Sequence, residues 1–210
     1  MYNRVGALLY AQLYAFNVCH DGRVATSGIY PRAPAGSPIN QAGLPEAARR
    51  LPNAYAVPHP VLNEDDCTHF ISCCIGANLQ VPSPPAVPNV RCGGGLSISQ
   101  PFGSSVFGHT TVPNLLWELL GITPLRKPLA RIAGSQFQKT NDETTRSNIA
   151  RLLQPGDLLA YSEKTDPSGY IHFAIIVGDA NIACHTYSRY NIDYTDVKKE
   201  YVTLVNMLDT

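Results

Sequence analysis

The sequence predicts an α+β fold, with helices first and an antiparallel sheet last. Before residue 154, apolar residues recur in several segments at three- and four-residue spacing, as expected of helices. After residue 156 the pattern changes to short runs of β-branched and aromatic residues separated by turn residues. Helices followed by a run of antiparallel strands are typical of the α+β class.

Two helices are expected early in the chain. Residues 2–17 carry apolar side chains at helical spacing together with alanines, which favour helix formation. Residues 67–79 read as a buried helix, and Asp66 is a suitable N-cap for it. Shorter helices are expected at residues 113–120 and 141–153.

The sheet is expected to contain four strands near the C-terminal end. Each is short, rich in β-branched or aromatic residues and bounded by turn residues. These strands are residues 157–162, 170–177, 181–187 and 201–208. Residues 20–62 and 81–110 lack periodicity and are rich in proline and glycine, so loops are expected there. Within the first of these, residues 44–51 could form a short helix.

Bulk composition indicates one globular domain over residues 1–210, with loop-rich insertions at about 20–62 and 81–150. Hydrophobic residues make up 44% of the chain and charged residues 15%, so the composition is not that of a disordered chain. The formal net charge is zero and no cluster of basic residues stands out. Electrostatic binding to nucleic acid or to an anionic membrane is therefore not expected. The sequence does not predict the oligomeric state.

The six cysteines are not needed as staples in a domain of this size. We therefore expect mostly reduced thiols, although the even number leaves a disulfide framework open. No apolar run is long enough to span a membrane, and no clear signal peptide precedes the domain. The chain could be cytoplasmic, or delivered or exported by a route that the sequence does not reveal. The cysteines are Cys19, Cys67, Cys73, Cys74, Cys92 and Cys184.

Cys67, His172 and His185 are the candidate catalytic residues. Cys67 follows the expected N-cap, where the positive end of a helix dipole lowers a thiol pKa. His172 interrupts an otherwise apolar strand, which favours a role as the base that takes the thiol proton. His185 lies on the next strand and is the candidate for orienting His172.

The third assignment depends on the register of the hairpin that joins these two strands. If residues 178–181 form a four-residue connection, Val177 opposes Ile182, and His185 shares a face with His172. A loop one residue longer or shorter would move His185 to the other face of the sheet.

Each of these residues also has a structural interpretation. Alone, Cys67 would most often be a buried core thiol and His172 a hydrogen-bonded core histidine. His185 alone would be an ordinary strand residue, and it is the order of all three that favours catalysis. His69 and Cys67 are two residues apart and point to different sides of a helix, so a shared metal site is not expected.

Five motifs in order resemble the amidase-domain family of papain-like cysteine hydrolases, which are related to NlpC-type cell-wall peptidases. Together they cover about half of the chain. In two places the sequence departs from the family pattern, with His69 where asparagine is usual and Cys73 where glutamine is usual. The motifs are Tyr2-Asn3-Arg4 with Ala7, Tyr10, Ala11 and Tyr14; Asp66-Cys67-Thr68-His69-Phe70-Ile71-Ser72-Cys73; Gly156-Asp157-Leu158-Leu159-Ala160-Tyr161; His172-Phe173-Ala174-Ile175-Ile176-Val177; and His185-Thr186.

The resemblance implies a papain-like fold in which the nucleophile helix packs on the C-terminal antiparallel sheet. It implies that Cys67 attacks an amide carbonyl, that His172 is the base and that His185 orients it, with no metal or organic cofactor. The oxyanion would be met by the Cys67 backbone N–H and one further donor. By analogy the substrate is a short peptide amide, such as a peptidoglycan stem peptide. A thiol acyltransferase of transglutaminase type and an inactive binding module on the same scaffold are the alternatives.

Overall fold

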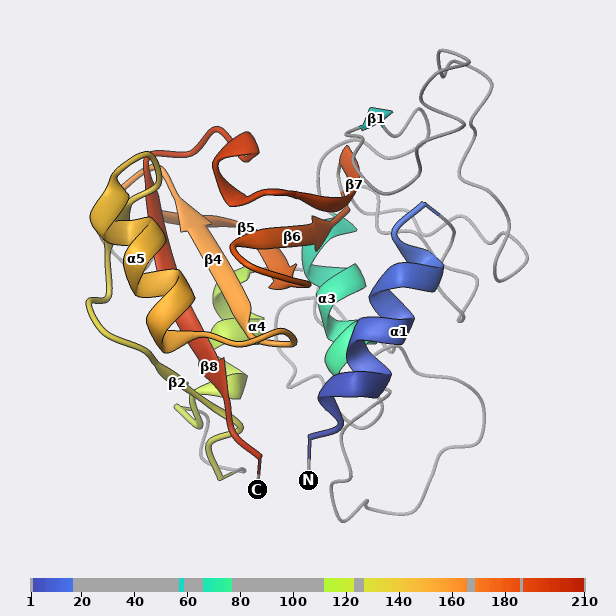
Figure 1. Cartoon of the computed structure of the whole chain (residues 1–210). Coiled ribbons are helices and arrows are strands. Elements are labelled where there is room, and N and C mark those ends of the chain that lie inside the picture. Colours follow the sequence, from blue (N-terminus) through green and yellow to red (C-terminus); the bar gives the residue numbers. More distant parts are fainter. Residues whose placement is uncertain are drawn as a thin grey trace.

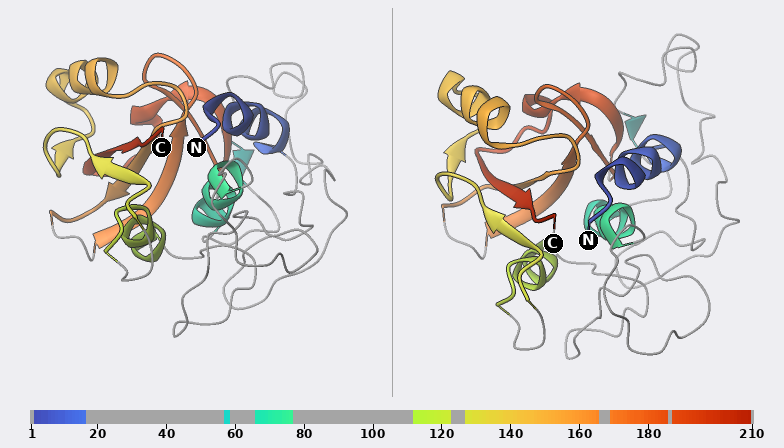
Figure 2. Two further views of the ribbon diagram at one scale, coloured as in Figure 1. Left: turned by 90° about the horizontal axis from the view of Figure 1, so that it is seen from below. Right: turned by 60° about the horizontal axis from the view of Figure 1, so that its bottom comes forward.

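The protein is described here from a computed structural model, which places residues 2–16, 57–58, 66–76, 112–122, 127–165, 169–185 and 187–209. These residues form one antiparallel sheet with helices on both of its faces (Figure 1). Helices α1, α3 and α4 lie on one side of the sheet, and α5 lies on the other (Figure 2). The predicted α+β class, with the Cys67 helix packed on a C-terminal antiparallel sheet, is confirmed.

The sheet has eight strands in the described part of the chain, and its main path runs β1-β7-β6-β5-β4-β8-β2, with β3 also pairing with β8. All pairs are antiparallel. The strands are β1 (Val57–Pro58), β2 (Ala130–Ile132), β3 (Gln138–Lys139), β4 (Leu158–Ser162), β5 (Tyr170–Ile176), β6 (Asn181–Cys184), β7 (Tyr187–Asp193) and β8 (Tyr201–Met207).

Three of the four expected strands are confirmed as β4, β5 and β8. The fourth is divided, because β6 ends at Cys184 and a new strand, β7, begins at Tyr187. β1 falls within residues 20–62, where only loop and a short helix were expected, and it pairs with β7. The short helix expected at residues 44–51 lies outside the described residues.

The helices lie where the periodicity predicted them: α1 (Arg4–Tyr14), α3 (Asp66–Gly76), α4 (Val112–Leu119) and α5 (Glu143–Leu152), with a 3-10 turn η3 (Tyr194–Asp196) before the last strand. Side-chain caps begin two of them. The Oδ1 of Asn3 accepts from the Gly6 N–H at 3.0 Å, and Oδ1 of Asp142 accepts from the Thr145 N–H at 2.7 Å. After α4 the chain turns at Gly121, whose φ of 68° suits glycine.

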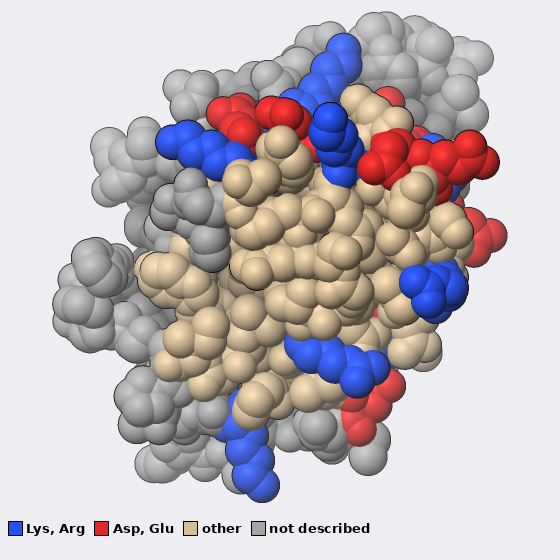
Figure 3. Space-filling view, turned by 90° about the vertical axis from the view of Figure 1, so that its left-hand side faces the viewer, with Lys and Arg blue, Asp and Glu red and all other residues tan. Residues whose placement is uncertain are grey.

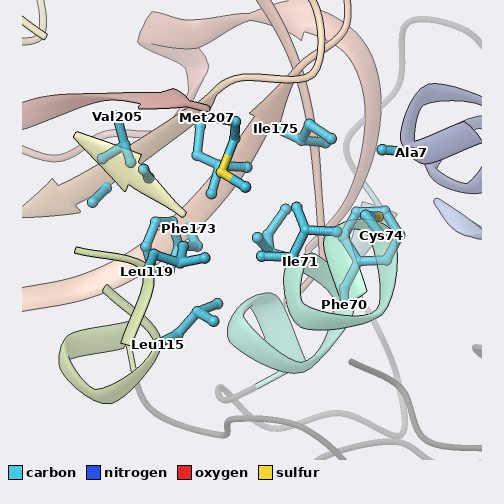
Figure 4. Close-up of a cluster of buried hydrophobic side chains, with 14 of the residues drawn as sticks. Ala7, Phe70, Ile71, Cys74, Leu115, Leu119, Phe173, Ile175, Val205 and Met207 are labelled. Carbon is cyan, nitrogen blue, oxygen red and sulfur yellow. The ribbon is translucent and has the colours of Figure 1, made fainter. Parts of the chain in front are cut away.

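The sheet carries a separate hydrophobic cluster on each face. One cluster joins α1, α3 and α4 to alternate residues of the strands, among them Phe173 and Ile175 (Figure 4). The other cluster joins α5 to the intervening residues, such as Ala174 and Ile176. Because successive side chains of a strand point to opposite faces, membership of a cluster shows which face a strand residue occupies.

Arg4 fixes the start of α1 to the end of the sheet. Its Nη1 donates to Oδ1 of Asp157 at 2.6 Å, its Nη2 to the Met207 carbonyl at 2.5 Å and its Nε to Asp209 at 3.0 Å. Asp157 is fully buried and also accepts from three N–H groups of the strand and turn segments. A close approach of Gly156 to Arg4, at a φ of 93°, completes this junction.

Candidate active site

Cys67 lies in the first turn of α3, as predicted. The helix begins at Asp66 itself rather than after it, a difference of one residue at a helix end. The Cys67 side chain is 2% exposed and belongs to the cluster between α3, α1 and the sheet. Its Sγ is 3.7 Å from Oγ1 of Thr68. The first backbone N–H groups of a helix have no partner within the helix, so the thiol lies beside the positive end of the α3 dipole.

His185 lies directly after β6 and reaches the same helix. Its ring stacks on that of Phe70, with 4.0 Å between centroids and 16° between planes. The Nε2 atom is 2.8 Å from the backbone carbonyl oxygen of Tyr14, at the end of α1. The side chain is 1% exposed. His185 is therefore held between α3 and α1, on the face of the sheet that also holds Cys67.

The hairpin between β5 and β6 differs from the expected register by one residue. Ile176 opposes Ile182, and Val177 hydrogen-bonds to Asn181, so residues 178–180 form a three-residue loop. The expected pairing of Val177 with Ile182 is wrong. Its physical cause is Ala180, which adopts a left-handed conformation at φ 58° and closes the turn one residue earlier.

His172 lies on β5 opposite Tyr161 of β4. Directly opposed residues of antiparallel strands point to the same face, and the two ring centroids are 5.8 Å apart. Tyr161 belongs to the cluster on the α5 side of the sheet. His172, which is 8% exposed, therefore points to the same face as Tyr161, opposite that of α3.

An irregularity in β5 lies directly before His172, whose own face follows from its regular alternation with Phe173. Tyr170 pairs with Ser162 and packs in the α3 cluster, whereas His172 pairs with Tyr161. Ile171 is therefore an extra residue at a bulge and is 42% exposed. The one-residue hairpin shift places His185 on the other face. The structure thus brings the Cys67 helix and His185 together and places His172 across the sheet.

The described cysteines agree with the expectation of mostly reduced thiols, with Cys73 as the exception. Cys73 is disulfide-bonded, to a partner outside the described residues. Cys67, Cys74 and Cys184 are not in disulfides, and all three are buried. His69, on the same helix, has its Nε2 3.7 Å from Sγ of Cys73.

Within the described ranges, no three His, Cys, Asp or Glu side chains gather in a way that could hold a metal ion. No described helix is long and apolar enough to cross a membrane. On the face seen in Figure 3, the described Lys and Arg side chains are mixed with Asp and Glu around a broad uncharged area. Positive charge does not dominate this face.

Two groups of the site were not among the sequence candidates. The Tyr14 carbonyl is a backbone acceptor, so no residue type in the sequence marks it. Phe70 was expected only as part of the apolar stripe of its helix, and its stacking on His185 depends on the hairpin register. Both depend on contacts between segments far apart in the sequence, which periodicity alone does not reveal.

Comparisons with known proteins give no match for this chain. No protein-family model matches the chain, and neither the curated proteins nor the solved structures give a significant match.

Proposed function

We propose that this protein is a cysteine hydrolase that cleaves an amide bond, with Cys67 as nucleophile and a histidine imidazole, from β5 or from the residue after β6, as base. One observation carries the proposal. Cys67 is a reduced thiol in the first turn of α3, and the His185 imidazole stacks on Phe70 one turn further along that helix. A thiol at a helix N-terminus with an imidazole nearby is the arrangement that generates a reactive thiolate.

The chemistry follows from these groups. The imidazole takes the proton of the Cys67 thiol, and the sulfur attacks the amide carbonyl carbon to form a C–S bond. The imidazolium then returns this proton to the nitrogen of the departing amine as the C–N bond breaks. Water hydrolyses the thioester, which releases the acid and restores the thiol. Backbone N–H groups in the first turn of α3, including that of Cys67, are suited to the developing oxyanion.

The five-motif resemblance supports a short peptide amide as substrate, with peptidoglycan stem peptides as the first to assay. The near-zero net charge agrees with a substrate that is not gripped through a strongly charged surface. Because Cys67 is 2% exposed, a substrate reaches its sulfur only when the covering groups open locally.

The test compares two cysteines of the same helix. Purified protein is incubated with peptidoglycan fragments, and new amine and carboxyl ends are measured by mass spectrometry. Cys67→Ala should abolish release. Cys74→Ala is the matched control, because Cys74 is another buried, reduced cysteine of α3 and lies two turns away. Release that persists in Cys67→Ala would exclude the proposed nucleophile.

A further inference from the structure

We infer that His185, rather than His172, is the imidazole that activates Cys67, and that the backbone carbonyl of Tyr14 orients it. This inference rests on the proposed function, and it names the base of the same site. Its parts come from three distant segments: the end of α1, the first turns of α3 and the residue after β6.

The first step concerns the protonation of the His185 ring. A carbonyl oxygen can only accept a hydrogen bond, so the 2.8 Å contact requires a proton on Nε2. In the neutral ring the other nitrogen, Nδ1, then carries the basic lone pair. The Tyr14 carbonyl thus performs the role of the orienting acceptor in a nucleophile–base–orienter triad. It also stabilises the imidazolium after proton transfer, because the Nε2–H donor remains in place.

The second step concerns distance along α3. Residues three apart on a helix are neighbours on its surface, with about 5–6 Å between their Cβ atoms. Phe70 follows Cys67 by three positions, and its ring lies 4.0 Å from that of His185. The imidazole therefore contacts α3 at a position one helical turn along from the thiol. Both side chains are almost fully buried, so water competes little for the proton.

The third step concerns His172. Its ring faces Tyr161 on the α5 side of the sheet, whereas Cys67 packs on the α3 side. A proton passing between them would have to cross the backbone layer of the sheet. His185 needs no such rearrangement.

The experiment measures alkylation of Cys67 by iodoacetamide at pH 6 and at pH 9 without substrate, with the modified residue located by fragment-ion mass spectrometry. His185→Gln is the central variant, because a glutamine amide can still donate to the Tyr14 carbonyl but cannot take a proton. His69→Gln is the matched control, because His69 is also a buried histidine and lies on α3 itself. The ratio of the two rates cancels the cost of local opening. Other titratable groups of α1 and α3, such as Tyr10 and Cys74, are unchanged in these variants.

We expect His185→Gln to lower the ratio of the pH 6 rate to the pH 9 rate at least about 10-fold, and amide hydrolysis at least about 100-fold, the usual loss for a general base. His69→Gln should keep the wild-type ratio. Long-range ¹H–¹⁵N spectra of the wild-type protein should show the His185 proton on Nε2. A His185→Gln ratio equal to that of the wild type, or a proton on Nδ1, overturns the inference. The alkylation readout needs no substrate, so its failure is distinct from the failure of the proposed hydrolysis.

Discussion

Replacing Arg4 by methionine should destabilise the protein much more than breaking a surface ion pair that has the same N–O distance. Methionine keeps most of the aliphatic stem and removes the guanidinium. The loss leaves the Asp157 carboxylate without its 2.6 Å partner at a position where its side chain is 0% exposed. The Met207 carbonyl loses a hydrogen bond from the same guanidinium.

The magnitude follows from burial. Removing one partner of a buried pair typically costs about 3–5 kcal/mol, because the remaining charge is uncompensated. Asp157 keeps three N–H donors, from Gln154, Asn206 and Met207. We therefore expect the lower end, about 3 kcal/mol. For a chain of this size, that corresponds to a fall of about 6–12 °C in Tm.

A second arginine gives a matched control. Arg146 also pairs with an aspartate, Asp193, at 2.6 Å, but these side chains are 49% and 33% exposed. Exposed pairs contribute about 0–1 kcal/mol, so Arg146→Met should change the free energy of unfolding by no more than that. Urea denaturation followed by circular dichroism measures both variants. Equal losses in Arg4→Met and Arg146→Met would refute the argument from burial.

Two further predictions concern a turn and a carboxylate. Gly156→Ala should cost about 1–2 kcal/mol of stability, because the φ of Gly156 is positive and a new Cβ would lie 3.2 Å from the Arg4 Cβ. Gly178→Ala is the control in the same denaturation assay, because a Cβ at Gly178 would have no heavy atom within 4 Å. Burial raises the pKa of Asp193, but hydrogen bonds from Thr195 and the nearby guanidinium outweigh it and leave the pKa below its usual value. That lowered pKa contributes stability above the unfolded-state pKa, and the contribution is lost as pH falls through the folded value. Thr195→Val should therefore raise the pKa of Asp193, which an NMR titration of its carboxyl group measures; an unchanged midpoint would contradict this explanation.

Much of the fold could be predicted because local signals agree with tertiary packing. Helix α3 carries apolar residues at helical spacing, and its described side chains are buried. Strands β4 and β8 are paired with other strands on both sides, so their runs of β-branched and aromatic residues reflect burial directly. Helix α4 ends where Gly121 offers a left-handed conformation.

The site could be predicted only in part. The sequence identified Cys67, His172 and His185 as chemical candidates, but whether the two histidines share a face depends on the register of one hairpin. Ala180 is an unusual residue for a left-handed turn position, so the three-residue loop has no clear sequence signal. The bulge at Ile171 likewise has no clear sequence signal. The hairpin shift alone is enough to place His185 and His172 on opposite faces, because side chains alternate along a strand.

The Arg4 junction also bears on the order in which the molecule can assemble. The guanidinium of Arg4 in α1 is separated along the chain by 153 residues from Asp157, by 203 from Met207 and by 205 from Asp209. Val5, Leu9 and Leu13 on the same helix stay largely solvent-exposed even after folding. The contacts of Arg4 with Met207 and Asp209 therefore cannot form until those residues have left the ribosome. The packing of α1 on α3 and β6, where the Tyr14 carbonyl meets His185, can form before β8 is made.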